Sequence, residues 1–211
     1  MTAPRAPRSE DSKTRNALLD ATLQLMVEEG YAAVSTRKVA AKAGANPALV
    51  YYYFRTMDEL FLAVFRRGAE ANLKRMRGAL AAEHPLRAVW EVSSEPTHAA
   101  LTMEFIALAN HRESIRAELA SYSTRFRQMQ EEVLTRALDT HGIDDDRFTP
   151  SALVVLIGGL SRSLAVDRML GLTAGHDEVR SLIDECLRHF EVPRAQKHST
   201  RATLTGEEAP D

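Results

Sequence analysis

Residues 35–60 read STRKVAAKAGANPALVYYYFRTMDEL, and this stretch decides the fold. Ser35 and Asn46 are preferred residue types at helix N-termini, because a side-chain oxygen can accept a hydrogen bond from a free amide of the first turn. Pro47 follows at a first helical position, where the missing amide had no partner. Gly44 suits the left-handed turn that ends a helix. The pattern predicts two short helices joined by a tight turn.

These helices, expected at about 36–43 and 47–53, fit a helix-turn-helix. In such a unit the second helix enters the major groove of DNA by its N-terminal residues. Ala40 is small enough to let the second helix approach, and Val50 fills the shared core. A capped helix with basic residues precedes the turn, and an aromatic cluster follows it. The pattern therefore favours DNA binding over a generic helical hairpin.

The composition bounds the class of protein. The chain has 211 residues, of which 45% are hydrophobic, with 10 Gly and 8 Pro, and this favours helices over strands. A single cysteine, Cys186, fits a reducing cytoplasm. The N-terminus lacks the apolar core of a signal peptide. Because the apolar stretch at 151–161 is shorter than the roughly 20 residues of a membrane span, no membrane partner is expected.

The charge distribution is uneven, although the net charge is −2. Residues 1–55 hold eight Lys and Arg against five Asp and Glu, whereas the other residues hold 19 against 24. A basic head on an acidic body is typical of a DNA-binding protein with a separate sensing domain.

Hydrophobic periodicity predicts an all-α fold. A first helix is expected at 12–29, and Thr56 is expected to cap a long fourth helix that passes Arg77. The remaining helices are expected at 86–93, 97–109, 112–140, 149–170 and 176–190. The predicted division is a flexible arm at 1–11, a three-helix helix-turn-helix DNA-binding domain at 12–60, a larger helical effector-binding and dimerisation domain at 61–192, reached through the long helix, and a disordered tail at 193–211.

The stretch Tyr51-Tyr52-Tyr53-Phe54, followed by Arg55-Thr56-Met57-Asp58-Glu59-Leu60, resembles the recognition-helix signature of the TetR family of one-component bacterial regulators. The upstream GYAAVSTRKVAAKAGAN resembles the start of the same motif. The resemblance covers about residues 12–65. It implies a cytoplasmic homodimer that binds double-stranded operator DNA and a small-molecule effector, with repression as the family-level expectation.

The resemblance also implies roles for single residues. Phosphates are expected to meet Ser35, Arg37 and the hydroxyls of Tyr51 and Tyr53, with Tyr52 in or beside the groove. Base edges are expected to meet Asn46, Pro47, Ala48 and Leu49, whose mostly apolar contacts suit thymine methyls. Met57 departs from the family, which usually has a phosphate-contacting Lys there. Arg55, Thr56 or the free amides at that helix start are expected to take over this contact.

The middle helices are expected to enclose an apolar cavity for an apolar or amphipathic effector. The candidate lining residues are Trp90, His98, Met103, Phe105, His111, Tyr122, Arg125, Phe126 and Met129. The seven histidines lack metal-ligand spacing, so no metal is expected. No cofactor loop or catalytic motif is present, so an enzyme is not expected.

The last two helices are expected to form the dimer interface, near 150–170 and 176–190. Residues 151–160 are apolar all round, which predicts a helix buried on several faces. Gly158 and Gly159 suggest a close approach of another helix there, and Cys186 is expected to be buried. Two further functions stay open: a DNA-bound architectural or division-linked protein without an effector, and a helical enzyme.

Overall fold

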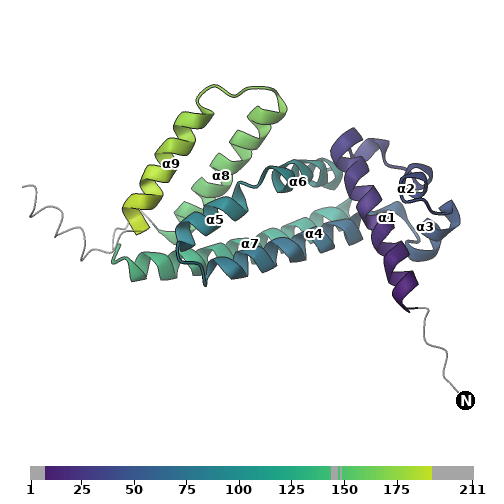
Figure 1. Cartoon of the computed structure of the whole chain (residues 1–211), viewed down its shortest axis with the longest axis horizontal. Coiled ribbons are helices and arrows are strands. Elements are labelled where there is room, and N and C mark those ends of the chain that lie inside the picture. Colours follow the sequence, from purple (N-terminus) through teal and green to yellow (C-terminus); the bar gives the residue numbers. More distant parts are fainter. Residues whose placement is uncertain (1–7, 144–146, 148, 192–211) are drawn as a thin grey trace, which may run out of the picture. The chain divides into compact units, whose positions relative to one another are not determined.

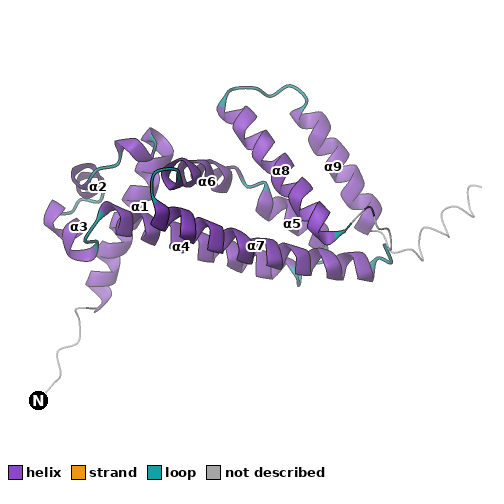
Figure 2. Cartoon of the chain, turned by 180° about the vertical axis from the view of Figure 1, so that it is seen from behind, coloured by secondary structure: helices purple, strands orange, loops and turns teal. Residues whose placement is uncertain are grey.

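A computed structural model describes residues 8–143, 147 and 149–191 of the chain. These residues form helices and contain no strand, which confirms the all-α prediction (Figure 2). The elements labelled in Figure 1 are α1 (Arg8–Glu29), the short 3-10 turn η1 (Tyr31–Ala33), α2 (Thr36–Lys42), α3 (Pro47–Tyr53), α4 (Met57–Ala79), α5 (Pro85–Ser93), α6 (Pro96–Ala109), α7 (Glu113–Thr140), α8 (Pro150–Met169) and α9 (His176–Glu191).

The start of α1 differs from the sequence prediction, whereas the other helix ends agree with it closely. Residues 8–11, predicted as part of a flexible arm, are helical. Glu10 and Asp11 lie in the first turn of α1, where the helix dipole favours acidic residues, and this extends the helix toward the N-terminus. The remainder of the predicted arm and the predicted tail at 193–211 lie outside the described residues.

The chain divides into two compact units. The first contains residues 1–72 and 97–124, and the second contains residues 73–96 and 125–211. The division passes through α4 and α7, so each of these helices contributes to both units. The predicted DNA-binding domain at 12–60 falls within the first unit.

The core of the first unit is built from apolar faces at helical spacing. Leu18 and Leu19 of α1 are buried with Leu60 and Phe61 of α4. Further buried residues follow at helical spacing, Leu25 and Met26 on α1 and Val64 and Phe65 on α4, so one side of each helix is buried. The aromatic rings of Phe65, Phe105 and Tyr122 form a second part of this core, with Phe65 edge-on to both of the others. Here a long helix, α4, is fixed against the segment at 97–124.

Polar contacts also tie the segment at 97–124 to the helix-turn-helix within the first unit. The Glu104 carboxylate accepts a hydrogen bond of 2.6 Å from the backbone amide of Tyr31, in the turn between α1 and α2. Arg112 pairs with Asp58 in the first turn of α4. Arg66 and Glu118 form a third pair at 2.6 Å, which raises the pKa of the Arg66 guanidinium. These contacts join residues at least 50 positions apart in sequence.

The second unit packs α5, α8 and α9 with the adjoining parts of α4 and α7. Two clusters of buried residues form its core, Met76, Ala79, Val89 and Val133 in one and Leu86, Leu134, Ala137 and Val154 in the other. Both views show α8 and α9 side by side, joined by the loop after residue 169 (Figures 1 and 2). On α7, the side chains of Ile115, Tyr122, Val133 and Ala137 are buried.

Three expectations for the last two helices are wrong within a single chain. The helix at 151–160 is not buried on several faces, since the side chains of Val155 and Leu156 are 58% and 65% exposed. No other part of the described chain lies within 4 Å of a Cβ built at Gly159. Cys186 is exposed rather than buried. These positions lie on the surface of a single chain, and the close approach at Gly158 and Gly159 was predicted for the dimer interface, where it stays a prediction.

The same pattern makes α8 long and apolar enough to cross a membrane by length and composition alone. Core helices of soluble proteins pass this test too, so it is weak evidence. The helix also carries Arg162, Asp167 and Arg168, charges that are costly inside a bilayer.

Candidate nucleic-acid interface

The turn between α2 and α3 is fixed by local hydrogen bonds. The Ser35 hydroxyl caps α2 by accepting from the backbone amide of Lys38 at 3.4 Å. At the other end, the amide of Ala45 donates to the carbonyl of Ala40, and the amide of Gly44 donates to that of Ala41. This is a Schellman motif, whose central residue must be left-handed, and Gly44 has φ +63°. The turn therefore follows from the sequence around Gly44.

The second helix of the motif begins as predicted. Asn46 caps α3, with its side-chain oxygen 2.9 Å from the backbone nitrogen of Ala48. Val50 is buried, as are Val39 and Ala40 of α2, so the shared core predicted for a helix-turn-helix is confirmed. Because Val50 points inward, the first turn of α3 presents its other residues to solvent.

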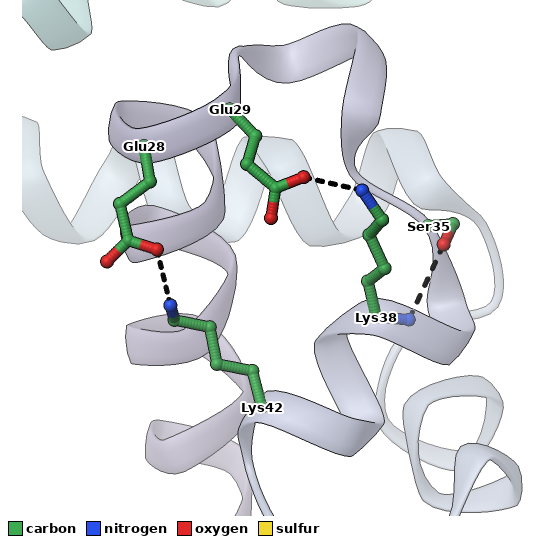
Figure 3. Close-up of polar contacts among 5 residues, drawn as sticks. All are labelled: Glu28, Glu29, Ser35, Lys38 and Lys42. Atoms are coloured by element: carbon green, nitrogen blue, oxygen red, sulfur yellow. Dashed lines mark hydrogen bonds and ion pairs between the residues drawn. The ribbon is translucent and has the colours of Figure 1, made fainter.

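Ion pairs join α1 to α2 and occupy two of the cations of the motif (Figure 3). The Lys38 ammonium lies 2.5 Å from a carboxylate oxygen of Glu29, and the Lys42 ammonium lies 2.5 Å from one of Glu28. Exposed pairs of this kind contribute little to stability, about 0–1 kcal/mol. Their effect here is to leave Arg37 as the α2 cation without an ion-pair partner among the described residues.

The predicted DNA-contacting residues lie close together in the first unit, and most are exposed. Tyr51 and Tyr52 are 62% and 71% exposed, whereas Phe54 is buried. Leu49 and Tyr53 are half-buried. The remaining predicted positions are all exposed: Ser35, Arg37, Asn46, Pro47, Ala48, Arg55 and Thr56.

The Tyr53 hydroxyl is engaged within the chain. It donates a hydrogen bond to the carboxylate of Asp11, near the start of α1. This hydrogen bond, with minor contributions from desolvation and from the charge of Asp11, raises the pKa of Tyr53 from 10.0 to about 12. In this conformation the Tyr53 hydroxyl therefore faces a carboxylate, and not the open surface that a phosphate contact requires.

At the start of α4, Met57 occupies the position where the family usually has a phosphate-contacting lysine. The Thr56 hydroxyl accepts from the amide of Glu59 at 3.1 Å, so Thr56 is the predicted N-cap, and the Glu59 carboxylate accepts from the amide of Arg55 at 2.9 Å. Met57 is half-buried, and its sulfur accepts from the Thr36 hydroxyl at 3.6 Å. Met57 thus packs the start of α4 against α2, and Arg55 is the neighbouring exposed cation.

Sequence reasoning missed Asp11, Glu28 and Glu29 as residues that shape this surface. Asp11 meets Tyr53 across 42 positions, and no local pattern indicates that contact. Glu28 and Glu29 lie at the C-terminal end of α1, and their lysine partners lie on the next helix, α2. Acidic residues at the end of one helix and basic residues on the next could therefore have indicated these ion pairs.

The family comparison agrees with this geometry. The model of bacterial regulatory proteins of the tetR family matches residues 18–64, which span α1 to the first part of α4. The match covers 47 of the 211 residues and identifies residues 18–64 as a TetR-family segment.

Among known proteins, this chain is similar to the HTH-type transcriptional regulator BetI of Rhizobium meliloti (strain 1021). The two are 29% identical over 122 residues, which cover 54% of this chain and 60% of BetI, so the match spans less than two thirds of the relative.

Two solved structures share the fold of this chain. One is a transcriptional regulator from Saccharomonospora viridis in complex with choline, with a TM-score of 0.73 and 18% identity, covering 84% of this chain and 97% of that one. The other is the regulator FadR from Bacillus subtilis in complex with stearoyl-CoA, with a TM-score of 0.62 and 17% identity, covering 79% and 96%. The likeness shows the common fold, and both proteins are described as regulators.

The candidate effector residues of the chain are divided between its two units. In the first unit, Phe105 and Tyr122 are buried in the aromatic cluster with Phe65, Met103 is half-buried and His111 is exposed. In the second unit, Phe126 and Met129 pack against a core cluster, Arg125 is exposed and Trp90 lines cavities. The side chain of His98 lies outside the described residues. The nine residues do not line one described cavity, and their role stays a prediction.

Two cavities of the second unit share Trp90. The larger, about 670 Å³, is almost entirely apolar and is lined mainly by α8 and α9. The smaller, about 270 Å³, lies among α5, α8 and α9 and is rich in charged residues. Within the described part of the chain, no group of three or more His, Cys, Asp or Glu could hold a metal ion.

Proposed function

We propose that this TetR-family regulator is a cytoplasmic homodimeric repressor that binds a near-palindromic operator and is released from it by a small-molecule effector. The observation that carries the proposal is the exposed face of α3, which includes its N-terminal residues. Pro47, Ala48, Tyr51 and Tyr52 face solvent on a helix whose inner side is held by Val50. A recognition helix needs this arrangement, because its N-terminal residues must reach the base edges while the helix stays packed.

The surrounding charges support DNA binding at the same surface. Arg37 and Arg55 are exposed and have no ion-pair partner among the described residues, whereas Lys38 and Lys42 are paired with glutamates. Cations that are not neutralised within the protein gain most from a phosphate backbone, because they release its counterions. We therefore assign the phosphate contacts to Arg37 and Arg55 and the base contacts to the first turn of α3.

Binding of an effector is supported by the ligands of the two structural neighbours. One was solved with choline and the other with stearoyl-CoA, so this fold accepts ligands that differ greatly in size. In this chain the cavities of the second unit provide space for a ligand outside the helix-turn-helix. An effector that binds one of two conformations more tightly shifts their populations, and this is how we propose that DNA is released.

Dimerisation is supported by the apolar surface of α8 and α9. Val155, Leu156 and Leu182 are exposed on these helices, next to the apolar cavity of about 670 Å³. Exposed apolar patches of this kind mark interaction surfaces. A second copy on the same surface would present two recognition helices to successive major grooves, as a near-palindromic operator requires.

The proposal is tested by selecting bound duplexes from a random DNA library with the full chain. We expect an inverted repeat whose half-site centres are about 10 base pairs, or a multiple of this, apart. Failure to enrich any sequence would contradict operator binding, and an enriched motif without two-fold symmetry would contradict the homodimer.

A matched pair of variants tests the assignment of phosphate contacts. Arg37→Gln and Lys42→Gln remove the same charge from the same helix, but Lys42 is already paired with Glu28. We expect Arg37→Gln to weaken binding to all sequences and to lower the salt slope by about 1, since each phosphate contact contributes about that much. Lys42→Gln should have a smaller effect. Equal losses of DNA affinity in the two variants would mean that the total charge of α2, and not a phosphate contact of Arg37, determines binding.

A further inference from the structure

The smaller cavity of the second unit is a polar site among α5, α8 and α9 that the helix-turn-helix does not use. Its volume is about 270 Å³, just below the 300–1,000 Å³ of pockets for drug-sized ligands. Trp90 forms part of its wall together with Leu164 and Ala165 of α8. A ligand of this site is therefore small, and part of it contacts apolar groups.

An unsatisfied hydroxyl lies on the lining of this cavity. Ser161 of α8 is 5% exposed, and its hydroxyl has no hydrogen-bond partner among the described residues. Buried hydroxyls are nearly always hydrogen-bonded, because a buried group without a partner loses its contacts with water. The hydroxyl of Ser161 thus points to an acceptor or donor supplied from outside the chain.

The charges of the lining favour an anion. Arg87 is paired with Asp184 at 2.7 Å, and Arg180 lies 3.2 Å from Asp177. Arg168 of α8 lines the cavity and has no ion-pair partner in the described part of the chain. Once these two ion pairs are set aside, the charges left in the lining are Arg168 and Glu91, so Arg168 is the cation that can meet an anionic group.

We propose that this cavity binds a small monocarboxylate, with its carboxylate on the Arg168 guanidinium and the Ser161 hydroxyl and its apolar part against Trp90. A planar guanidinium binds a carboxylate through two parallel hydrogen bonds, and the Ser161 hydroxyl donates a third. A single negative charge pairs with Arg168, whereas a phosphate dianion would bring a second negative charge into a confined site that already holds Glu91. The role of this ligand as an effector rests on the proposed function, whereas its binding to the cavity does not.

Trp90 provides the measurement, because it is the single tryptophan of the chain. The probes are butyrate and cyclohexanecarboxylate, with butyramide, cyclohexanecarboxamide and inorganic phosphate as comparisons. We expect the carboxylates to change Trp90 emission with saturation at millimolar concentration, and calorimetry to give the same affinity. The amides and phosphate should bind at least about tenfold more weakly. The amides carry no negative charge to pair with Arg168, and phosphate brings a second negative charge into the site.

Variants on α8 locate the site. Arg168→Gln should weaken carboxylate binding about tenfold or more, and Ser161→Ala should weaken it several-fold. Arg162→Gln is the matched control, because it removes the same charge from an exposed position of α8 that does not line the cavity. No saturable binding of any carboxylate would overturn the proposal. Equal binding of acids and amides, equal binding of phosphate, or equal losses in Arg168→Gln and Arg162→Gln would overturn it too.

The same samples separate this inference from the proposed function. DNA binding is measured by selection or by gel shift on the selected duplex, with and without the carboxylate. A chain that binds DNA but no carboxylate keeps the proposed function and loses the site. A chain that binds the carboxylate but no DNA keeps the site and loses the proposed function.

Discussion

At the scale of single residues, the contact between Tyr53 and Asp11 changes what the end of the recognition helix can offer to DNA. The pKa of Tyr53 is raised to about 12 by its hydrogen bond to Asp11, so the phenol stays protonated at every physiological pH. The carboxylate both occupies the donor and places a negative charge where a phosphate would approach. Asp11 therefore opposes phosphate binding at Tyr53.

Asp11→Asn tests this opposition. We expect the pKa of Tyr53 to fall from about 12 toward 10.0 and DNA binding to tighten several-fold for all sequences alike. Since the folded pKa is raised, the contact stabilises the fold below pH 10, and this contribution is lost as the pH rises through about 12. The pKa is measured by NMR of labelled tyrosine rings and the affinity by gel shift. Asp20→Asn, an exposed change elsewhere on α1, should alter neither.

Leu49 and Tyr51 are expected to play different roles in DNA binding. Tyr51→Phe should weaken binding to all sequences alike, because a phosphate contact carries no sequence information. Leu49→Ala should change the preference at one base pair by about 1–3 kcal/mol. Gel shifts on the selected operator, on single-base variants and on scrambled DNA distinguish the two. A uniform loss for Leu49→Ala would contradict its role at a base edge.

At the scale of elements, the caps of the short helices carry both stability and position. Asn46→Ala removes the acceptor for the amide of Ala48 and should lower the free energy of unfolding by about 1 kcal/mol. Asn46→Ser keeps a capping oxygen and should retain most of that free energy, while any base contact of Asn46 is still lost. Denaturant unfolding and gel shifts on both variants separate the cap from the contact. Equal stability of the two variants would show that the cap contributes nothing.

The elements themselves were largely predictable, because their signals are local. Ser35, Asn46, Thr56 and Gly44 mark helix ends through hydrogen bonds within a few residues, and the structure has these ends where the sequence predicts them. Contacts such as Glu104 with the amide of Tyr31 were not predictable, since they depend on which helix lies opposite another.

The candidate effector residues illustrate the same limit. Sequence reasoning placed Phe105 and Trp90 in the lining of one effector cavity, but it could not indicate that the two belong to different units. The polar cavity with Ser161 and Arg168 was missed, because an isolated serine and arginine on an apolar helix carry no motif.

At the scale of the whole molecule, one chain leaves apolar surface uncovered. Sequence reasoning expected α8 to be buried, and Val155, Leu156 and Leu182 are instead exposed in the single chain. The apolar pattern of α8 was therefore recognised, but no part of the described chain covers these side chains. A homodimer through α8 and α9 accounts for it, because an isologous interface needs a self-complementary apolar patch.

Gly159→Glu tests the dimer. Gly159 is exposed, and nothing in the described chain lies within 4 Å of a Cβ built there, so a single chain accommodates a side chain at this position. In a permanent interface, typically above about 2,000 Å², an inserted carboxylate would be buried without a partner and would separate the copies. Light scattering should give twice 23.4 kDa for the wild type and 23.4 kDa for the variant.

Gly78→Glu provides the matched control, because Gly78 is an exposed glycine of α4 with the same open surroundings. It should remain a dimer, and both variants should keep the helical circular dichroism of the wild type. Gly159→Glu should also lose affinity for the inverted repeat while retaining weak binding to a single half-site, since each head still folds. A monomeric wild type, or a Gly159→Glu chain that stays dimeric, would place the interface elsewhere. The exposed apolar residues of α8 would then need a different partner.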